Sequence, residues 1–430
     1  MIDHRVLSET LTACRAAARR DFIRNTLCAA VVPTLGALVA AAADAKSKPR
    51  AAAEPAVITK KFKVGVIGLG GRGNWVAKFF KQHGGFEIHA GCDYFQEEAD
   101  KFGGTYGIPK ERLFAGLGGY KKLIESGVDI VAAETVPYFL PEIVTAAVAA
   151  AKHVYMAKPV AVDVPGCLAV RAAARDASAR KQMFMVDFQA PTDPLLIELR
   201  QGIRDGGLGQ IAYVCTYGVV GQQCAEPARE MPKPERLRKQ LWAFDRVLGA
   251  DVCAQFDVHA IDLAVWVLGK TPIEAMGFAA IKRPNPVLDG VDVLQTVARF
   301  DDGVIWTHQH QSLKNNSDLT GGGGLVCKIM GNATSAVLPY VGKAFIRGGE
   351  KHRVGTVENT YAAGVERNVA QYYKNLIEGR FESETAPRAV DTQLTAILFR
   401  EAGRRGARLT MSELLKENKK LDYDLSGFDV

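Results

Sequence analysis

The chain has 430 residues, of which 48% are hydrophobic and 23% are charged, and its net charge at pH 7 is +7. This composition is that of a folded protein with room for two or three domains, and it excludes a disordered or collagen-like chain. The sequence contains no dense block of Lys and Arg, so we expect no nucleic-acid partner.

The first 45 residues are typical of an export signal. The segment Arg19-Arg20-Asp21-Phe22-Ile23-Arg24 precedes an uncharged, moderately apolar stretch, and Ala43-Asp44-Ala45 matches a cleavage site. This arrangement resembles a bacterial twin-arginine signal peptide, which predicts export to the periplasm through the twin-arginine machinery. The apolar stretch is too short and too weak for a comfortable membrane span, so we expect none after processing. The alternative is an N-terminal anchoring helix. Residues 46–61 are Pro/Ala/Lys-rich, which is typical of an exposed arm or linker.

The next stretch carries the strongest chemical signal in the chain. An apolar run over residues 63–67 predicts a strand, residues 74–80 predict a helix, and between them lies a G-x-G-x-x-G motif. In such a motif Gly68 allows a tight turn, Gly70 allows the backbone to approach a pyrophosphate, and Gly73 allows close packing of helix on strand. The free N–H groups and the dipole at the helix N-terminus then favour the phosphates.

An acidic residue follows the motif at the spacing that a dinucleotide site needs. Asp93 ends the second apolar segment, twenty positions after Gly73, where a carboxylate can bind the adenosine ribose. This context distinguishes a dinucleotide site from the alternative, an ordinary glycine-rich turn. We therefore predict a dinucleotide cofactor.

Strands and helices then alternate, which predicts a doubly wound parallel sheet over residues 62–182. Ligands of such sheets bind at the carboxyl ends of the strands. The predicted cofactor-binding residues therefore lie at those ends: Gly68, Leu69, Gly70, Gly71, Arg72, Gly73, Asp93, Thr135, Pro137 and Lys158.

The pattern changes in residues 183–430, which we assign to a second domain. Helices are expected near 194–205 and at 258–268 and 363–378, and Asp301-Asp302-Gly303 predicts a hairpin turn. Consecutive strand-like segments without intervening helices predict an α+β domain with an antiparallel or mixed sheet. These segments are 211–220, 273–282, 294–300, 304–311, 327–330 and 336–339.

Two short segments contain candidate catalytic residues. Lys158 follows a predicted strand end, where its ammonium group could stabilise the alkoxide of a substrate hydroxyl; the alternative is a solvated surface lysine. On a predicted helix, Gln255, His259 and Asp262 share one face at i, i+4 and i+7. His259 could take a proton from a hydroxyl, or it could be a buried structural histidine paired with Asp262.

No metal site is predicted. Zinc could bind His259 and Asp262, but no third ligand has suitable spacing. The eight cysteines are scattered without a C-x-x-C pair, and several lie in apolar strand-like runs, which favours buried free thiols.

Taken together, these residues resemble the glucose–fructose oxidoreductase/inositol dehydrogenase (Gfo/Idh/MocA) family, in its exported form with a twin-arginine signal. The resemblance runs from about residue 63 to the C-terminal region. It rests on the glycine loop, Asp93, the Ala157-Lys158-Pro159 segment, residues 258–263 and residues 367–373. It implies a Rossmann domain, a second α+β domain for which we expect a large open, mostly antiparallel sheet, and a homodimer or homotetramer built through that sheet. It also implies NAD(P)-dependent chemistry on sugars or cyclitols, and some exported members retain their cofactor.

The resemblance assigns roles to particular residues and also exposes departures. Lys158 corresponds to the lysine of the family's E-K-P motif, and His259 corresponds to its proposed proton acceptor. Asp93 corresponds to the acidic residue on the adenosine ribose, which implies NAD as the cofactor, with NADP less favoured. The glutamate before Lys-Pro is Ala157 here, and the aspartate four residues before the histidine is Gln255. A histidine common on the cofactor side is missing after Thr135.

The resulting hypothesis is an exported NAD-dependent oxidoreductase that acts on a hydroxyl of a sugar, glycoside or cyclitol. His259 takes the proton, Lys158 polarises the oxygen, and Tyr138 and Gln255 position the substrate. Two alternatives remain: a glycosidase that uses bound NAD in oxidation, elimination and reduction, and a non-catalytic NAD- or sugar-binding protein.

Overall fold

The structure is a computed structural model, and it describes residues 58–429 apart from 221–225, 314–323 and 359. The predicted export signal (1–45) and most of the predicted arm (46–61) lie outside the described residues. None of the helices in the described part of the chain is both long and apolar enough to cross a membrane.

The first sheet is parallel and has the strand order β3-β2-β1-β4-β5-β6, as predicted for a Rossmann domain. Its strands are β1 (Phe62–Ile67), β2 (Phe86–Asp93), β3 (Leu113–Ala115), β4 (Ile130–Ala133), β5 (His153–Ala157) and β6 (Phe184–Asp187). The intervening helices are α3 (Gly71–His83), α4 (Gln96–Tyr106), α5 (Gly119–Glu125), α6 (Leu140–Ala149) and α7 (Val164–Ala179). Buried Val, Ile and Ala residues dominate β1 and β4 because helices cover both faces of the sheet.

The expected boundary between the two domains, after residue 182, does not coincide with the end of the first sheet. β6 pairs with β5 in parallel register, so the first sheet continues to Asp187. The helix α12 (Thr360–Glu378) also returns to this domain, where its apolar side packs on α3 and on the sheet. Membership of a sheet depends on long-range strand pairing, which local sequence patterns do not record.

The second sheet has nine strands in the order β14-β13-β12-β11-β7-β10-β9-β8-β15. Its strands are β7 (Ile211–Val220), β8 (Glu274–Ala280), β9 (Val293–Arg299), β10 (Ile305–Ser312), β11 (Leu325–Gly331), β12 (Ser335–Pro339), β13 (Gly342–Ile346), β14 (Arg353–Val357) and β15 (Leu409–Thr410). Among the described residues, the strands of this sheet pair antiparallel except for β7 with β10, and the predicted hairpin turn joins β9 to β10. The prediction of a large, mostly antiparallel sheet is confirmed.

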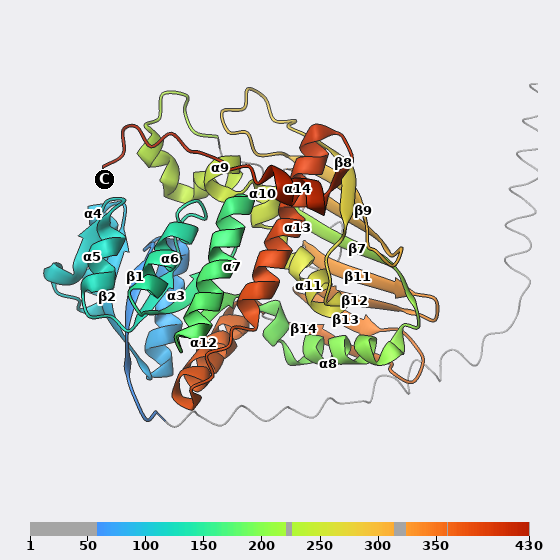
Figure 1. Ribbon diagram of the computed structural model, residues 1–430, viewed down its shortest axis with the longest axis horizontal. Coiled ribbons are helices and arrows are strands. Elements are labelled where there is room, and N and C mark those ends of the chain that lie inside the picture. Colours follow the sequence, from blue (N-terminus) through green and yellow to red (C-terminus); the bar gives the residue numbers. More distant parts are fainter. Residues whose placement is uncertain (1–57, 221–225, 314–323, 359, 430) are drawn as a thin grey trace, which may run out of the picture. The chain divides into compact units, whose positions relative to one another are not determined.

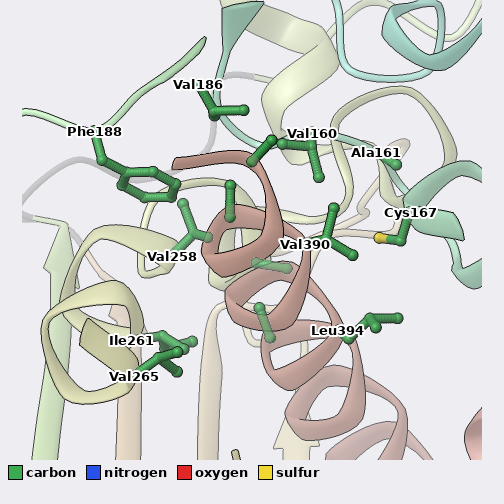
Figure 2. Packing of buried hydrophobic residues seen from close by; sticks show 14 of the residues in the cluster. Val160, Ala161, Cys167, Val186, Phe188, Val258, Ile261, Val265, Val390 and Leu394 are labelled. Carbon is green, nitrogen blue, oxygen red and sulfur yellow. The ribbon is translucent and has the colours of Figure 1, made fainter. Parts of the chain in front are cut away.

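Helix α13 (Thr385–Arg405) connects the two sheets. In Figure 1 it runs between α7 and the strands of the second sheet, and it packs on α7, on α11 (Val258–Leu268) and on β8. Figure 2 shows Val390 and Leu394 on the side of α13 toward Cys167 of α7, while Ile261 and Val265 of α11 lie on its other side. Both domains therefore share one hydrophobic core, which holds the carboxyl ends of β5 and β6 close to α11.

Several shorter helices complete the fold. They are α8 (Pro194–Gly202), α9 (Arg246–Gly249), α10 (Val252–Gln255), α14 (Met411–Glu417) and the 3₁₀ segment η4 (Lys233–Phe244). Asp193 caps α8 by accepting hydrogen bonds from the N–H groups of Leu195 and Leu196. After α14 the chain continues as an extended C-terminal segment, 418–429.

Candidate active site

A cleft of about 1010 Å³ lies at the carboxyl ends of the first-sheet strands. Of the predicted cofactor-binding residues, it is lined by Gly68, Gly70, Gly71, Arg72, Asp93 and Thr135. Leu69 is buried in the core beneath it, and Gly73 lies inside α3. Lys158 and Pro137 do not line this cleft.

The glycine loop has the geometry that the motif predicts. Gly68 adopts a φ of +87°, in the left-handed region that favours glycine, and a Cβ there would lie 2.7 Å from the Glu134 carbonyl oxygen. A Cβ on Gly73 would lie 1.8 Å from the carbonyl oxygen of Gly68, so only glycine lets α3 start this close to β1. A Cβ on Gly70 would meet nothing within 4 Å, which leaves its backbone open to the cleft.

Asp93 stands at the end of β2 on the wall of the cleft. Its carboxylate accepts hydrogen bonds from the backbone N–H groups of Leu69 (2.7 Å) and Phe95 (3.1 Å). Burial raises its pKa, and the bond from Leu69 opposes that shift. These two bonds tie β2 to the glycine loop and fix the carboxylate, which retains acceptor capacity toward the cleft.

Two segments of the second half of the chain cover the cleft. From η4, Arg238 places its guanidinium 3.4 Å from the ring centroid of Phe95, and Trp242 also lines the cleft. In the C-terminal segment, the N–H of Tyr423 donates to the Tyr138 hydroxyl (3.3 Å), and the N–H of Asp429 donates to the Tyr94 hydroxyl (3.1 Å). The loop that ends at Arg238 is long, polar and proline-bearing, and from the sequence we expect that it could lie near a site. The C-terminal part of the cover was missed, because a short polar tail carries no periodic signal.

A second group of residues lies beside the cleft, where β5 and β6 meet α10 and α11. The Lys158 ammonium donates a hydrogen bond to the backbone carbonyl of Gln255 (2.8 Å). His259 is buried, and its Nδ1 lies 3.0 Å from the hydroxyl of Tyr340. The structure thus brings Lys158, Gln255 and His259 together, although Gln255 contributes its backbone oxygen to this contact.

The expected placement of Gln255 and His259 on one helix is wrong. Gln255 and His259 do not lie on one continuous helix, because α10 ends at Gln255 and α11 begins at Val258. The break is at Asp257, whose carboxylate is buried and bonded to His308 Nε2 (3.0 Å) and His310 Nδ1 (2.9 Å). Asp262 is also not a partner of His259, since it binds Arg388 (2.9 Å) and Thr392 (3.2 Å).

Tyr138 lies apart from the Lys158–His259 group. Its side chain lines the dinucleotide cleft, where it accepts the bond from the C-terminal segment and packs on the Phe139 ring at 5.1 Å. Among the described residues, no hydrogen bond or ring contact joins Tyr138 to Lys158 or His259. This position suits contact with a cofactor better than contact with a substrate at His259.

Arg72 links the cleft to the second group. From the glycine loop its guanidinium pairs with Glu134 (2.9 Å), which follows β4, and with Asp187, which ends β6. Burial raises the pKa of Glu134 to about 8, and Arg72 opposes that shift. The sequence analysis identified Arg72 but missed Glu134 and Asp187. Both residues lie at the carboxyl ends of strands, which is the same signal that identified Lys158.

The protonation of the second group is set mainly by burial. Burial, followed by the charge of Arg72, lowers the pKa of Lys158 to about 7. Burial, followed by the charges of Lys158 and Arg72, lowers the pKa of His259 well below its ordinary value. His259 is therefore neutral at pH 7, and a neutral imidazole is the form that can accept a proton.

The lowered pKa of Lys158 predicts that this residue costs stability. Because its folded-state pKa lies below the unfolded value, the charged lysine lowers the free energy of unfolding. This loss has its full size below pH 7 and decreases as the pH rises toward 10. We expect Lys158→Met to raise the free energy of unfolding by about 1–2 kcal/mol at pH 6, and less at pH 9, in urea denaturation. Lys152→Met is the matched control, because Lys152 also donates to a backbone carbonyl, that of Val128. An equal gain in both variants would contradict this explanation.

The described residues contain no group of three or more His, Cys, Asp or Glu side chains arranged to hold a metal ion. The cysteines at 92, 167, 215, 253 and 327 are free and buried. Burial raises the pKa of the Cys92 thiol to about 12, so this thiol is protonated at neutral pH.

Comparison with known proteins agrees with this geometry. Residues 62–188 match the model of the Gfo/Idh/MocA oxidoreductase family, which is described by its NAD-binding Rossmann fold. Inositol 2-dehydrogenase of Rhizobium meliloti is 23% identical over 247 residues, which cover 55% of this chain and 66% of that enzyme. The match thus spans slightly less than two thirds of the length of that relative.

Solved structures show the same fold over most of the chain. Scyllo-inositol dehydrogenase from Lactobacillus casei, with bound NAD(H) and scyllo-inositol, superposes with a TM-score of 0.63 at 16% identity, covering 82% of this chain and 100% of that one. Aldose-aldose oxidoreductase from Caulobacter crescentus, complexed with glycerol, gives a TM-score of 0.64 at 18% identity, with 82% and 100% coverage.

Proposed function

We propose that this chain, whose residues 62–188 carry the NAD-binding Rossmann fold of the Gfo/Idh/MocA oxidoreductases, exchanges a hydride between NAD and a CH–OH group of a cyclitol or sugar. One observation carries the proposal. Lys158 and a neutral, buried His259 lie together at the strand ends beside the dinucleotide cleft. That is where an oxidoreductase needs a hydrogen-bond donor and a base.

The residues present fit a dinucleotide. The open backbone at Gly70 and the N-terminus of α3 would hold the pyrophosphate, and Asp93 would accept hydrogen bonds from the adenosine ribose. A carboxylate at that position disfavours the 2′-phosphate of NADP, so we expect NAD. Cover by Arg238 and by the C-terminal segment supports tight retention of the cofactor.

When bound, the nicotinamide accepts or supplies the hydride. Residues of the chain itself would transfer the proton and stabilise the charge. The Lys158 ammonium would donate a hydrogen bond to the substrate oxygen and stabilise negative charge on it. His259 would take the hydroxyl proton during oxidation and return it during reduction.

The relatives favour polyhydroxylated rings or sugars as substrates, because inositol dehydrogenases and an aldose-aldose oxidoreductase are among them. The test is to incubate the purified protein and NAD with myo-inositol, scyllo-inositol, aldoses and aryl glycosides, and to record NADH absorbance and released aglycone. Formation of NADH supports the proposal. Release of aglycone without net NADH supports the NAD-using glycosidase instead, and neither product with any substrate would refute both.

Two further properties belong to the proposal. The resemblance of residues 1–45 to a twin-arginine signal supports export as a folded protein, which suits an enzyme that acquires its cofactor before export. A fusion of residues 1–45 to a reporter should reach the periplasm, and replacing Arg19 and Arg20 by Lys should stop it.

Self-association through the second sheet is supported by the exposed face of that sheet. The strand register places Met276, Val297, Phe345 and Val354 in one row across it, and Met276, Val297 and Val354 are 53%, 46% and 61% exposed. Phe278 on the same face is 71% exposed. Thr307 and Lys328 lie in the same row, between the apolar residues. Exposed apolar patches on a surface typically mark interaction sites, and we propose a second copy of this chain as the partner.

We expect Phe278→Glu to weaken self-association, because it would bury a carboxylate between the two copies. Multi-angle light scattering should show a smaller mass for this variant than for the wild-type protein. Ile197→Glu on α8 is the control, since Ile197 is 46% exposed but lies away from the sheet face. A monomeric wild-type protein would contradict the proposed oligomer.

A further inference from the structure

The carboxylate that the family places four residues before its histidine is Gln255 here, so the orientation of His259 needs another source. In this chain Tyr340, at the end of a second-sheet strand, contacts His259 and is itself hydrogen-bonded to Gln189, just beyond β6. Tyr340 follows β12, and Gln189 lies two residues after β6. Both side chains are buried, with 1% and 0% exposure, so water does not compete for their hydrogen bonds.

The hydrogen bonds in this group have only one consistent direction. The side-chain amide of Gln189 lies 3.1 Å from the backbone carbonyl oxygen of Asp187. A carbonyl oxygen can only accept, so the amide group that faces it is the NH₂, and the amide oxygen faces the other way. That oxygen lies 2.9 Å from the Tyr340 hydroxyl. Because an amide oxygen also only accepts, the hydroxyl proton of Tyr340 is donated to Gln189.

This direction fixes the tautomer of His259. The single proton of Tyr340 is already donated, so its oxygen faces Nδ1 of His259 (3.0 Å) as an acceptor. Nδ1 must then carry the imidazole proton, and Nε2 carries the lone pair. Among the described residues, none forms a hydrogen bond with Nε2.

We infer that Gln189 and Tyr340 are positioning residues that hold His259 in the Nδ1–H tautomer, which leaves Nε2 free as the base for a substrate hydroxyl. The inference rests on the proposed function for its catalytic meaning, but the tautomer itself is a property of the chain. The packing keeps Gln189 in place, since a Cβ on Gly364 of α12 would lie 2.4 Å from the Cβ of Gln189. The other charged and titratable groups that act on His259 are Lys158 and Arg72, and the ring of Tyr361 lies 6.2 Å from its ring.

Two substitutions at Gln189 separate this role from a merely structural one. Gln189→Leu removes the acceptor at similar volume, so the Tyr340 proton turns to Nδ1 and the tautomer reverses to Nε2–H. Gln189→Glu is the rescue: buried beside Asp187 it will be protonated, so its O–H donates to the Asp187 carbonyl and its C=O still accepts from Tyr340. Gln182→Leu is the control, because Gln182 is a buried glutamine that donates to backbone carbonyls elsewhere.

The experiment is ¹⁵N NMR of the histidine side chains in the full chain labelled with ¹⁵N-histidine, with His259 assigned from a His259→Gln sample. We expect Nδ1–H in the wild type, in Gln182→Leu and in Gln189→Glu, and Nε2–H in Gln189→Leu. In turnover, kcat of Gln189→Leu should fall about 100-fold or more, while KM and NAD affinity stay unchanged. An Nε2–H tautomer in the wild type, or the same tautomer in Gln189→Leu as in the wild type, overturns the inference. Absence of turnover with every substrate would refute the proposed function and leave the tautomer result standing.

Discussion

Replacing His259 by Ala is expected to lower turnover by a factor of about 10²–10⁴, which is the usual contribution of a positioned general base. The imidazole is buried, uncharged at neutral pH and held by Tyr340, so the substitution removes the proposed base. Affinity for NAD should stay unchanged, because His259 does not line the dinucleotide cleft. Steady-state NADH formation and NAD titration on the same preparation measure both quantities.

The control for this substitution is His352→Ala. His352 is exposed in the loop before β14 and accepts a hydrogen bond from the N–H of Gly348, so it reports any general effect of losing an imidazole. It should keep wild-type turnover. If His259→Ala also kept the wild-type rate, His259 would be a structural histidine and the proposed mechanism would be wrong.

The second large effect is expected at Gly73. In Gly73→Ala the new Cβ would lie 1.8 Å from the Gly68 carbonyl oxygen, and backbone atoms cannot yield as a flexible side chain can. We expect a loss in the free energy of unfolding on the order of 3 kcal/mol, as for severe overpacking. The backbone movement that relieves this clash would also displace the turn at Gly68, so NAD binding should be lost. Urea denaturation and NAD titration test the two parts separately.

Two other glycines serve as controls that show whether the loss of stability comes from the contact between residue 73 and the Gly68 carbonyl oxygen. Gly104→Ala, inside α4, meets nothing within 4 Å and should stabilise the protein slightly through helix propensity. Gly70→Ala also meets nothing, so it should leave stability intact but weaken NAD binding, because the methyl group would project into the cleft. Wild-type stability in Gly73→Ala would contradict the close approach of α3 to β1.

The first domain could be predicted largely from local patterns. Parallel strands buried on both faces read as short apolar runs, and the glycine loop fixes the start of α3, so β1 and α3 were identified together. α13 could not be predicted in this way. From Thr392 to Arg400 it is buried on every side, with Thr392, Gln393 and Arg400 in the interior, so this part lacks the one-sided apolar stripe that marks an amphipathic helix.

The residues of the candidate site also fall into those that local patterns predict and those that they do not. Lys158, Asp93 and the glycines follow strands directly, so their place at one edge of the sheet follows from topology. Gln189 and Tyr340 come from segments 151 positions apart in the chain, and only the packing of the second sheet on α11 brings them to His259. No motif records such a contact. Gln255 stands where the resemblance places an aspartate, but this departure does not identify Gln189 or Tyr340.

The nucleotide content of the purified protein tests the central claim most directly. The protein is denatured, the released nucleotide is identified by mass spectrometry, and any empty fraction is titrated with NADH while energy transfer from Trp242, which lines the cleft, is recorded. The geometry of the glycine loop and of Asp93 predicts one NAD(H) per chain, either released on denaturation or bound on titration, with NADPH binding more weakly. A chain that releases no nucleotide and binds neither NADH nor NADPH would contradict the proposed cofactor site.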